Sequence, residues 1–372
     1  MHRLRLTLLA AVAALAVLSI VPSAVAASSS QTGADRAGKT ADHVRRHHHH
    51  GPRLDARVKP GQSIQAAIDA ADAGARIGIA RGTFHENLLI TKPVTLIGKH
   101  AVLVPPTAPV ENACSQSETG EAVVTGICIV GTLKPDGTVA ATVDNVRLTG
   151  LTIAGFSGDG AFAFGAKRFT ADHNVFKDNG GYGVFALQST RTTYAWNVSH
   201  DNGDAGFYVG ESPTATVRIV FNASYRNEGE GILFRDSLGG VIAHNALFGN
   251  CAGLFVLDTG VPGAGGSVDV LANVVARNNA TCPPDGPAPQ FGGIGIALLG
   301  ATDTDVHRNR IVGNVAQADS AIPGGGLVLV SSVPFGGADP TDNVVTRNHL
   351  ARNTPAVTYD GSGTGNIVRF NR

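Results

Sequence analysis

Asparagine recurs with a regular spacing through the C-terminal two-thirds of this 372-residue chain. Seven times, one asparagine is followed by another after four intervening residues. The pairs are Asn174/Asn179, Asn197/Asn202, Asn222/Asn227, Asn245/Asn250, Asn273/Asn278, Asn309/Asn314 and Asn348/Asn353. Successive first asparagines are 23, 25, 23, 28, 36 and 39 residues apart. A short unit that repeats and tolerates insertions predicts a solenoid of stacked coils.

Two further columns of mostly apolar residues keep the register of the asparagines. One stands three residues before the first asparagine of each pair: Ala171, Tyr194, Ile219, Ile242, Val270, Val306 and Val345. The other stands two residues after it: Phe176, Ser199, Ser224, Leu247, Val275, Ile311 and Leu350. Alternation with a period of two predicts short strands with one face inward, and parallel coils stack at about 4.8 Å.

The asparagines themselves are interpreted as architectural. A side-chain amide both donates and accepts hydrogen bonds, so identical asparagines in successive coils can bond one another and nearby backbone. Asparagine also tolerates the left-handed backbone conformation, and we expect it to turn the corners of the coils.

The segment before the repeats contains an amphipathic pattern. Pro60-Gly61-Gln62-Ser63-Ile64 opens a predicted helix, QSIQAAIDAADAG, with Ile64, Ala67, Ile68 and Ala71 on one face. ARIGIARGTFHENLLITKPVTLIG follows. From Val58 to Arg372 the chain resembles the right-handed parallel β-helix proteins of the pectate-lyase-like superfamily. The resemblance implies an all-β, right-handed parallel β-helix whose first coil is capped by the helix. The family spans lyases, hydrolases, esterases, epimerases and proteins without a known reaction, so it implies a fold more than an activity.

Residues 1–58 lack the repeat pattern. Two arginines, an apolar run over 6–21 and Ala24-Val25-Ala26 predict a signal peptide at 1–26. Residues 27–58 are interpreted as a flexible polar linker, and 59–372 as the β-helix domain. The linker contains the tract His47 to His50, which either binds a divalent metal or is incidental. We expect a secreted protein with no transmembrane segment after signal cleavage.

Export makes the four cysteines candidates for disulfides, with three possible pairings. Cys114 and Cys128 flank a polar insertion and most simply pair with each other. Cys251 and Cys282 then form the second bridge, at nearly matching places in adjacent coils. The overall charge is balanced, with 29 Lys+Arg against 29 Asp+Glu, which argues against a nucleic-acid partner.

Candidate catalytic residues gather near the middle of the repeats. Asp204, Glu228 and Glu230 lie between a second asparagine and the next strand, while Tyr208 and Arg235 stand at outward positions of neighbouring strands. The resemblance implies activity on this strand-and-loop face. Bound Ca²⁺ could neutralise a uronate while Arg235 or Tyr208 moves a proton. The alternative is a set of solvated turn residues. Because an exposed side chain contributes little to folding, we expect Arg235→Ala to shift the melting temperature by only a few degrees.

Two other columns could bind ligands. Glu211, Asp236 and Asp258 would stack as a carboxylate ladder that could hold Ca²⁺, unless all three are solvated. His173, Trp196, Phe221 and His244 each precede a first asparagine. They could form a platform for sugars, or each could simply fold over its neighbour.

Two function hypotheses follow. One is a polysaccharide lyase or glycoside hydrolase acting on an extracellular acidic polysaccharide. The other is a non-catalytic β-helix that binds a glycan or another surface. A pectin methylesterase is disfavoured, because Ala161 stands where that family's nucleophilic aspartate belongs. The outward positions Phe185, Leu187, Leu233, Phe255, Leu257, Leu299, Val328 and Val330 are apolar, so loops or a partner should cover them.

Overall fold

The protein is described from a computed structural model, which covers residues 53–116, 120–261, 265–282, 284 and 289–372. The expected signal peptide and the histidine tract lie outside these residues. Of the expected linker, Ala56–Val58 form a strand, β1, that pairs with β2 (Ala75–Ile79) and belongs to the solenoid. The β-helix therefore begins before residue 59. In the described part, no helix is long and apolar enough to cross a membrane.

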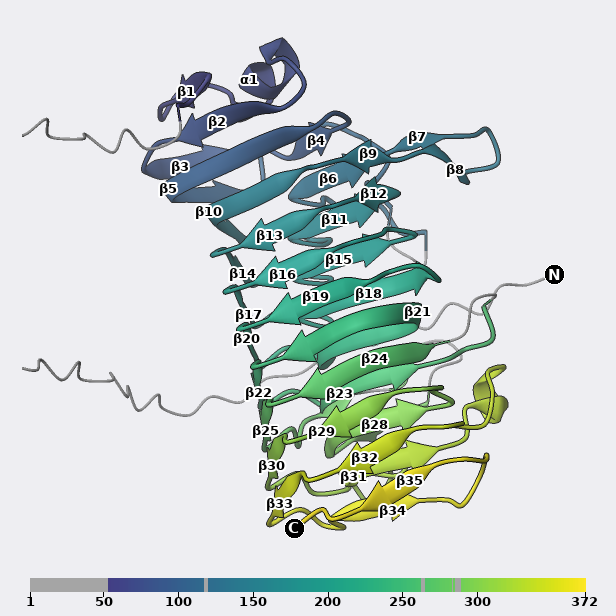
Figure 1. Ribbon diagram of the computed structural model, residues 1–372. Coiled ribbons are helices and arrows are strands. Elements are labelled where there is room, and N and C mark those ends of the chain that lie inside the picture. Colours follow the sequence, from purple (N-terminus) through teal and green to yellow (C-terminus); the bar gives the residue numbers. More distant parts are fainter. Residues whose placement is uncertain (1–52, 117–119, 262–264, 283, 285–288) are drawn as a thin grey trace, which may run out of the picture. The chain divides into compact units, whose positions relative to one another are not determined.

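Three columns of strands run along the solenoid, and each complete coil contributes to all three in turn (Figure 1). Column 1 contains β1, β2 (Ala75–Ile79), the first half of β5 (Val94–Val104) and of β10 (Arg147–Ala154), β13 (Thr170–Asp172), β16 (Thr193–Ala195), β19 (Val217–Val220), the end of β21 (Glu230–Ala243), β24 (Gly266–Leu271), β29 (Asp305–His307), β32 (Val344–Thr346) and β35 (Ile367–Arg369).

Column 2 is built of shorter strands. It contains β3 (Gly82–His85), the second halves of β5 and β10, β14 (Val175–Lys177), β17 (Val198–His200), β20 (Ala223–Tyr225), β22 (Ala246–Phe248), β25 (Val274–Ala276), β30 (Arg310–Val312) and β33 (His349–Ala351). Column 3 contains β4 (Leu88–Ile90), β6 (Ile127–Val130), β11 (Ala161–Phe164), β15 (Val184–Leu187), β18 (Phe207–Ser212), the start of β21, β23 (Ala252–Leu257), β28 (Ile294–Leu299), β31 (Gly325–Val330) and β34 (Val357–Tyr359). Neighbours within each column pair in parallel.

The remaining elements are short and lie in the connections. They are the antiparallel pair β7 (Thr132–Leu133) and β8 (Val139–Ala141), the parallel pair β9 (Val143–Asp144) and β12 (Ala166–Lys167), the antiparallel pair β26 (Thr281–Cys282) and β27 (Phe291–Gly292), and the 3₁₀ helix η1 (Val333–Phe335). The connections after β25 and β30, in column 2, and after β31, in column 3, are long and account for the growing repeat spacing.

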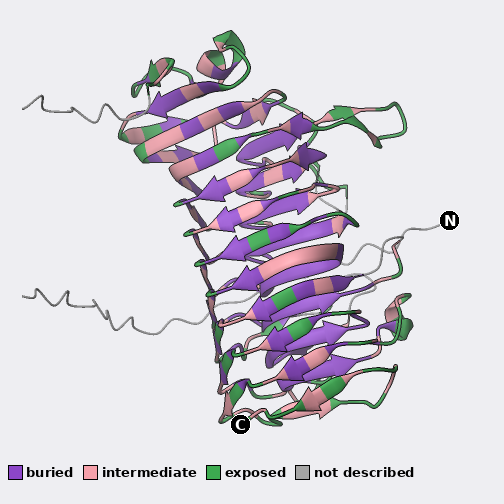
Figure 2. Cartoon of the chain, in the orientation of Figure 1, coloured by how far each residue is buried: buried purple, intermediate pink, exposed green. Residues whose placement is uncertain are grey.

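The core fills the space between the columns. Both apolar columns predicted from the sequence point inward. Tyr194, Ile219 and Phe176, for example, are fully buried. Among the predicted positions only Leu350, beside the last asparagine pair, is partly exposed. Figure 2 shows the same pattern, with buried strands in the middle coils and more exposed residues in α1 and the last coil.

Helix α1 (Ile64–Ala70) covers the first coil, as expected. Its inward face consists of the predicted residues: Ile64 and Ile68 are buried, and Ala67 and Ala71 pack against the core. Glu86, from the turn after β3, accepts hydrogen bonds from the backbone N–H of Ile64 (2.7 Å) and of Gln65 (3.0 Å). A carboxylate at free backbone N–H groups stabilises the start of a helix. The turn after β3 therefore holds α1 in place over the first coil.

The asparagines form continuous ladders through the interior. Asn197 illustrates the geometry: its Oδ1 accepts from the backbone N–H (3.0 Å) and the side-chain amide (3.1 Å) of Asn174. Its own amide group donates to the carbonyl of Ala171 (2.8 Å) and to Oδ1 of Asn222 (3.0 Å). The predicted side-chain ladder is therefore confirmed, and it also satisfies backbone groups at two corners of each coil.

The left-handed corner conformation belongs to the residue before each asparagine, not to the asparagine. His173 and Asp178, for example, have φ of 56° and 55°. This placement is a correction of the sequence-based expectation. The physical reason is that the turn residue points its side chain outward, whereas the following asparagine points inward and reaches the neighbouring coils.

Both predicted disulfides are present. Cys114–Cys128 spans a Cα–Cα distance of 5.7 Å and Cys251–Cys282 one of 5.6 Å. Both distances lie in the ordinary range for disulfides.

Replacement of Asn222 by alanine tests the ladder. Asn222 accepts from the backbone and the side chain of Asn197 and donates to Tyr194 and Asn245. The change leaves buried donors and acceptors without partners, so we expect urea unfolding to show a loss of about 2–4 kcal/mol. Asn371→Ala, in the partly exposed last coil, is the control and should cost less than about 1 kcal/mol. Equal losses would contradict a role that depends on burial.

Candidate functional site

The outer face of column 3 is apolar and covered. Its outward side chains include Phe185, Leu233, Phe255 and Val328, each no more than 7% exposed. They form a second hydrophobic cluster, outside the solenoid core, with side chains from the connecting loops. The cluster contains Phe291 of β27 and Ile322, and Phe335 of η1 packs against it. The prediction that loops cover these positions is confirmed, although Leu187 stays half-buried.

Arg235 is the cation at the centre of this face. It lies on β21 beside Gly210 of β18, and its guanidinium sits 5.3 Å from the ring centroid of Tyr208. Tyr208 in turn stacks on Phe185, with centroids 4.2 Å apart and planes 3° from parallel. A Cβ at Gly210 would come within 2.5 Å of the Tyr208 hydroxyl, so a glycine is required there.

Several carboxylates surround the guanidinium. Its Nε lies 3.4 Å from Asp236 Oδ2, and its Nη2 lies 3.9 Å from Glu211 Oε1. Burial raises the pKa of Asp236, while hydrogen bonds from Thr259 and the charge of Arg235 act in the opposite direction. Burial also raises the pKa of Glu230 to about 7, and Arg235 again lowers it in part. A carboxyl group that titrates near neutral pH is suited to proton transfer.

A small pocket lies beside Arg235 and Glu230. It has a volume of about 30 Å³, enough for about two water molecules. Its lining consists of Tyr182, Asp204, Glu230, Leu233, Arg235, Phe255, Leu257, Thr259, Phe291, Leu299, Ile322 and Phe335. The structure therefore combines a cation, two carboxylates and a mostly apolar wall.

Three of the five candidate catalytic residues meet in the pocket: Asp204, Glu230 and Arg235. Tyr208 lies beneath Arg235, where it positions the guanidinium. Glu228 is half-buried and does not line the pocket. The expected exposure of Tyr208 and Arg235 is wrong, because the loops bury them to 0% and 7% exposed.

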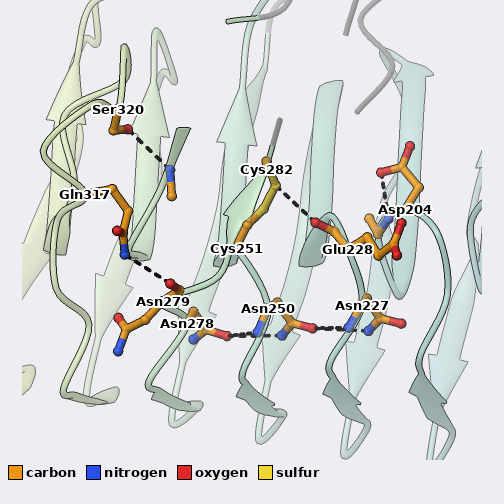
Figure 3. The surroundings of a disulfide bond; sticks show 12 residues. Asp204, Asn227, Glu228, Asn250, Cys251, Asn278, Asn279, Cys282, Gln317 and Ser320 are labelled. Atoms are coloured by element: carbon orange, nitrogen blue, oxygen red, sulfur yellow. Dashed lines mark hydrogen bonds between the residues drawn. A yellow bond between two sulfur atoms is a disulfide. The ribbon is translucent and has the colours of Figure 1, made fainter. Parts of the chain in front are cut away.

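The Cys251–Cys282 disulfide lies next to Glu228 (Figure 3). Cys282 Sγ is 3.2 Å from the carbonyl oxygen of Glu228. Cys282 also pairs with Phe291 across β26 and β27. The disulfide thus joins the wall of the solenoid to the strand pair that carries Phe291 over the pocket.

The carboxylate ladder does not become a calcium site. Asp236 is 1% exposed and accepts hydrogen bonds from the backbone and the hydroxyl of Thr259, both at 2.6 Å. Asp258 accepts from the backbone N–H two residues later at 2.7 Å, and Glu211 faces Arg235. Among the residues that the structure describes, no group of three His, Cys, Asp or Glu side chains could hold a metal ion. The expectation for Glu211, Asp236 and Asp258 is corrected, because local partners already occupy these carboxylates.

The aromatic corner column does stack, but its geometry does not suit sugars. Ring centroids are 6.3 Å apart for His173 and Trp196, 4.4 Å for Trp196 and Phe221, and 4.9 Å for Phe221 and His244. All three pairs lie within 16° of parallel. The inner ring faces therefore cover one another and leave edges to solvent, whereas a sugar packs on a ring face. The arrangement favours the alternative in which each corner residue folds over its neighbour.

Sequence reasoning missed two features of the surface. A second stack, His200–Tyr225–Phe248, follows column 2, with centroids 4.9 Å apart at both steps. It could have been found three residues after each first asparagine. The pocket residues Phe291, Ile322 and Phe335 come from insertions that carry no repeat signal, so register could not place them.

Comparisons with known proteins agree with this architecture. Residues 118–262 match a family model described as a right-handed β-helix region. No curated protein matches the sequence. The fold is similar to that of the periplasmic alginate epimerase AlgG, with a TM-score of 0.56 and 13% identity over 86% of this chain and 84% of that one. It is also similar to the A-module of the mannuronan C-5 epimerase AlgE4 from Azotobacter vinelandii, with a TM-score of 0.53 and 19% identity over 83% of this chain and 88% of that one.

These findings define the class of the protein. The chain folds as a right-handed parallel β-helix, and its residues 118–262 match the family model of such a region. At such identities the likeness concerns the fold alone, so the activity must be argued from the pocket.

The titration of Glu230 predicts a pH-dependent stability. The folded state holds its proton up to about pH 7, whereas the unfolded chain releases it near pH 4.5. The stabilisation is therefore complete below pH 4.5 and is lost as the pH rises through 7. Glu230→Gln cannot ionise, so its stability relative to the wild type should increase over this range by up to about 3 kcal/mol. Urea unfolding between pH 4 and 8 measures this difference, with the exposed Glu111→Gln as control. A constant difference would show that Glu230 titrates normally.

Burial of Arg235 reverses the expectation from the sequence. Arg235→Ala leaves the buried carboxylates Glu230 and Asp236 without their cation. We expect a loss of about 3 kcal/mol in the free energy of unfolding at pH 8. Arg191→Ala, at an exposed corner, should change it by less than about 0.5 kcal/mol. A melting temperature for Arg235→Ala within about one degree of wild type would contradict the buried network.

Proposed function

We propose that the protein acts on an acidic polysaccharide and that the reaction takes place in the pocket around Glu230 and Arg235. The observation that carries the proposal is a fully buried carboxyl group with a pKa of about 7 in the same pocket as a buried guanidinium. Neither group belongs to the asparagine ladders or the core that hold the coils together. Perturbed titratable groups in a pocket are more often functional than groups of ordinary pKa.

The pocket residues fit the first step of uronate chemistry. Arg235 would bind the carboxylate of a uronate, and neutralising that charge makes the hydrogen on the adjacent carbon more acidic. Glu230, ionised at and above about pH 7, would accept this proton. Asp204 lines the same pocket and would serve as the second proton-transfer group. Expulsion of the glycosidic oxygen completes a lyase reaction, whereas return of the proton to the opposite face completes an epimerase reaction.

The similar solved structures are consistent with this substrate class. They are named as an alginate epimerase and a mannuronan C-5 epimerase. An extracellular or periplasmic location belongs to the same proposal. Two disulfides and a signal-like N-terminal sequence support it, since disulfides persist in oxidising compartments.

A second candidate is a β-helix that binds polysaccharide without catalysis. The observation that favours it is the size of the pocket: about 30 Å³ is too small for a sugar ring. Phe291, Ile322 and Phe335 would have to move before a sugar could reach Glu230. Under this alternative the buried charges only hold the covering loops.

Glu230→Gln separates the two candidates. The amide imitates the protonated carboxyl group, so the variant should fold like the wild type while it cannot accept a proton. On polygalacturonate and alginate at pH 8, we expect turnover to fall at least about 100-fold. Unsaturated products measured by ultraviolet absorbance report the lyase reaction, and NMR of the uronate ratio reports the epimerase reaction.

The control for this experiment is the exposed Glu111→Gln, which should keep its turnover within about twofold of wild type. Wild-type protein that turns over neither polymer, with unchanged binding in Glu230→Gln, would reject the catalytic proposal and support the binding one. Equal turnover in Glu230→Gln and wild type would place the reaction elsewhere.

A further inference from the structure

Exposed arginines gather on one flank of the last coils, at column 2 and its two corners. They are Arg277, Arg308, Arg310, Arg347 and Arg352, here called the basic flank. The flank follows β25, β30 and β33, which lie one after another along the solenoid (Figure 1). Between residues 265 and 372 the chain has seven arginines, so five of them share this one surface.

The register aligns these side chains in rows parallel to the solenoid axis. Arg308 and Arg347 occupy the same corner in successive coils, with φ of 57° and 58°. Arg310 pairs directly with His349 across β30 and β33. Arg277 and Arg352 hold the other corner, with φ of 52° and 56°. Coils stack at about 4.8 Å, so the cations repeat at that step or a small multiple of it.

The chain segments that cross the basic flank contain no acidic residue. The three passes across the flank read ANVVARN, RNRIVGN and RNHLARN, over residues 272–278, 308–314 and 347–353. The same segment, 265–372, does contain eight aspartates, but all of them lie outside these passes. The balanced charge of the whole chain therefore conceals a local separation of the signs.

Some arginines of the earlier coils form ion pairs, although Arg57, Arg81 and Arg191 form none with any residue that the structure describes. Arg147 pairs with Asp172 at 2.7 Å, and Arg226 pairs with Asp201 at 2.6 Å. In contrast, no arginine of the basic flank forms an ion pair with any residue that the structure describes. Two unit charges about 5 Å apart in water repel by about 0.8 kcal/mol, so a row of such cations opposes folding slightly. A polyanion along the row would relieve this repulsion.

We propose that the basic flank is a binding track for a linear anionic polysaccharide that runs along the solenoid axis. A polyuronate carries one carboxylate per sugar, so its charges form a single spaced row, as the arginines do. Double-stranded DNA carries one charge per about 1.7 Å, a much denser array than one cation row can match. A membrane presents a plane of charge, whereas this track is one three-residue strand and its corners wide.

The track is separate from the pocket on column 3, and its binding does not require turnover there. The inference extends the proposed substrate class to a second surface, and its test therefore uses binding alone. A polymer held on the track would keep a processing enzyme, or a non-catalytic binder, attached to its polysaccharide.

The test compares two triple variants in the full chain. Arg308→Gln/Arg310→Gln/Arg347→Gln removes three charges from the flank. Arg57→Gln/Arg81→Gln/Arg191→Gln removes three exposed charges elsewhere and is the matched control. Binding of oligogalacturonate is measured by isothermal titration calorimetry at low and physiological salt. We expect the flank variant to bind about tenfold more weakly, and the control within about twofold of wild type, with affinity falling as salt rises.

Two outcomes would overturn the inference. Equal affinity in both triple variants would show that the flank does not hold the polymer. Wild-type binding to duplex DNA or to phosphatidylserine vesicles that is tighter than to the oligouronate would assign the flank to another partner. If the flank variant loses binding while Glu230→Gln shows no loss of turnover, the track stands and the catalytic proposal falls.

Discussion

The hydrogen bonds of the buried asparagines are the interaction on which the rest of the structure depends. A coil of about 23 residues must turn sharply several times, and each corner interrupts the strand pairing that would otherwise satisfy its backbone. The asparagine after each turn supplies the missing partners from inside, as Asn197 does for Asn174 and Ala171. Because each amide contacts the coils on both sides, the ladders also hold the coils in register.

This dependence explains why the fold could be predicted from the sequence. The ladder requires the same residue at the same place in each coil, so Asn174 to Asn348 form a pattern that is visible without coordinates. The inward columns through Ile219 and Leu247 and the capping face at Ile64 and Ile68 follow from simple periodicity. The assignment of the corner turn to asparagine itself failed, because φ depends on which neighbour faces outward, and spacing alone does not show this.

The candidate site could be predicted only in part. Asp204, Glu230 and Arg235 stand in repeat register, so their proximity could be inferred. Their burial could not, because it depends on Phe291, Ile322 and Phe335 from insertions that differ in length and sequence. Burial is also what raises the pKa of Glu230 and makes Arg235 a buried cation rather than a solvated one. The chemistry of the face is thus decided by segments outside the repeat.

The outward corner positions have an evolutionary consequence. A residue such as Trp196, Phe221 or Arg308 turns the chain with its backbone, while its side chain extends away from the ladder and the core. A substitution there changes the surface of one coil and leaves its interior contacts intact. The corner residues can therefore vary while the interior of each coil stays the same. In this chain, neighbouring corners are aromatic at Trp196 and Phe221 and cationic at Arg308 and Arg347. New surface specificities could arise in this protein by single substitutions, without any change in how the coils fold.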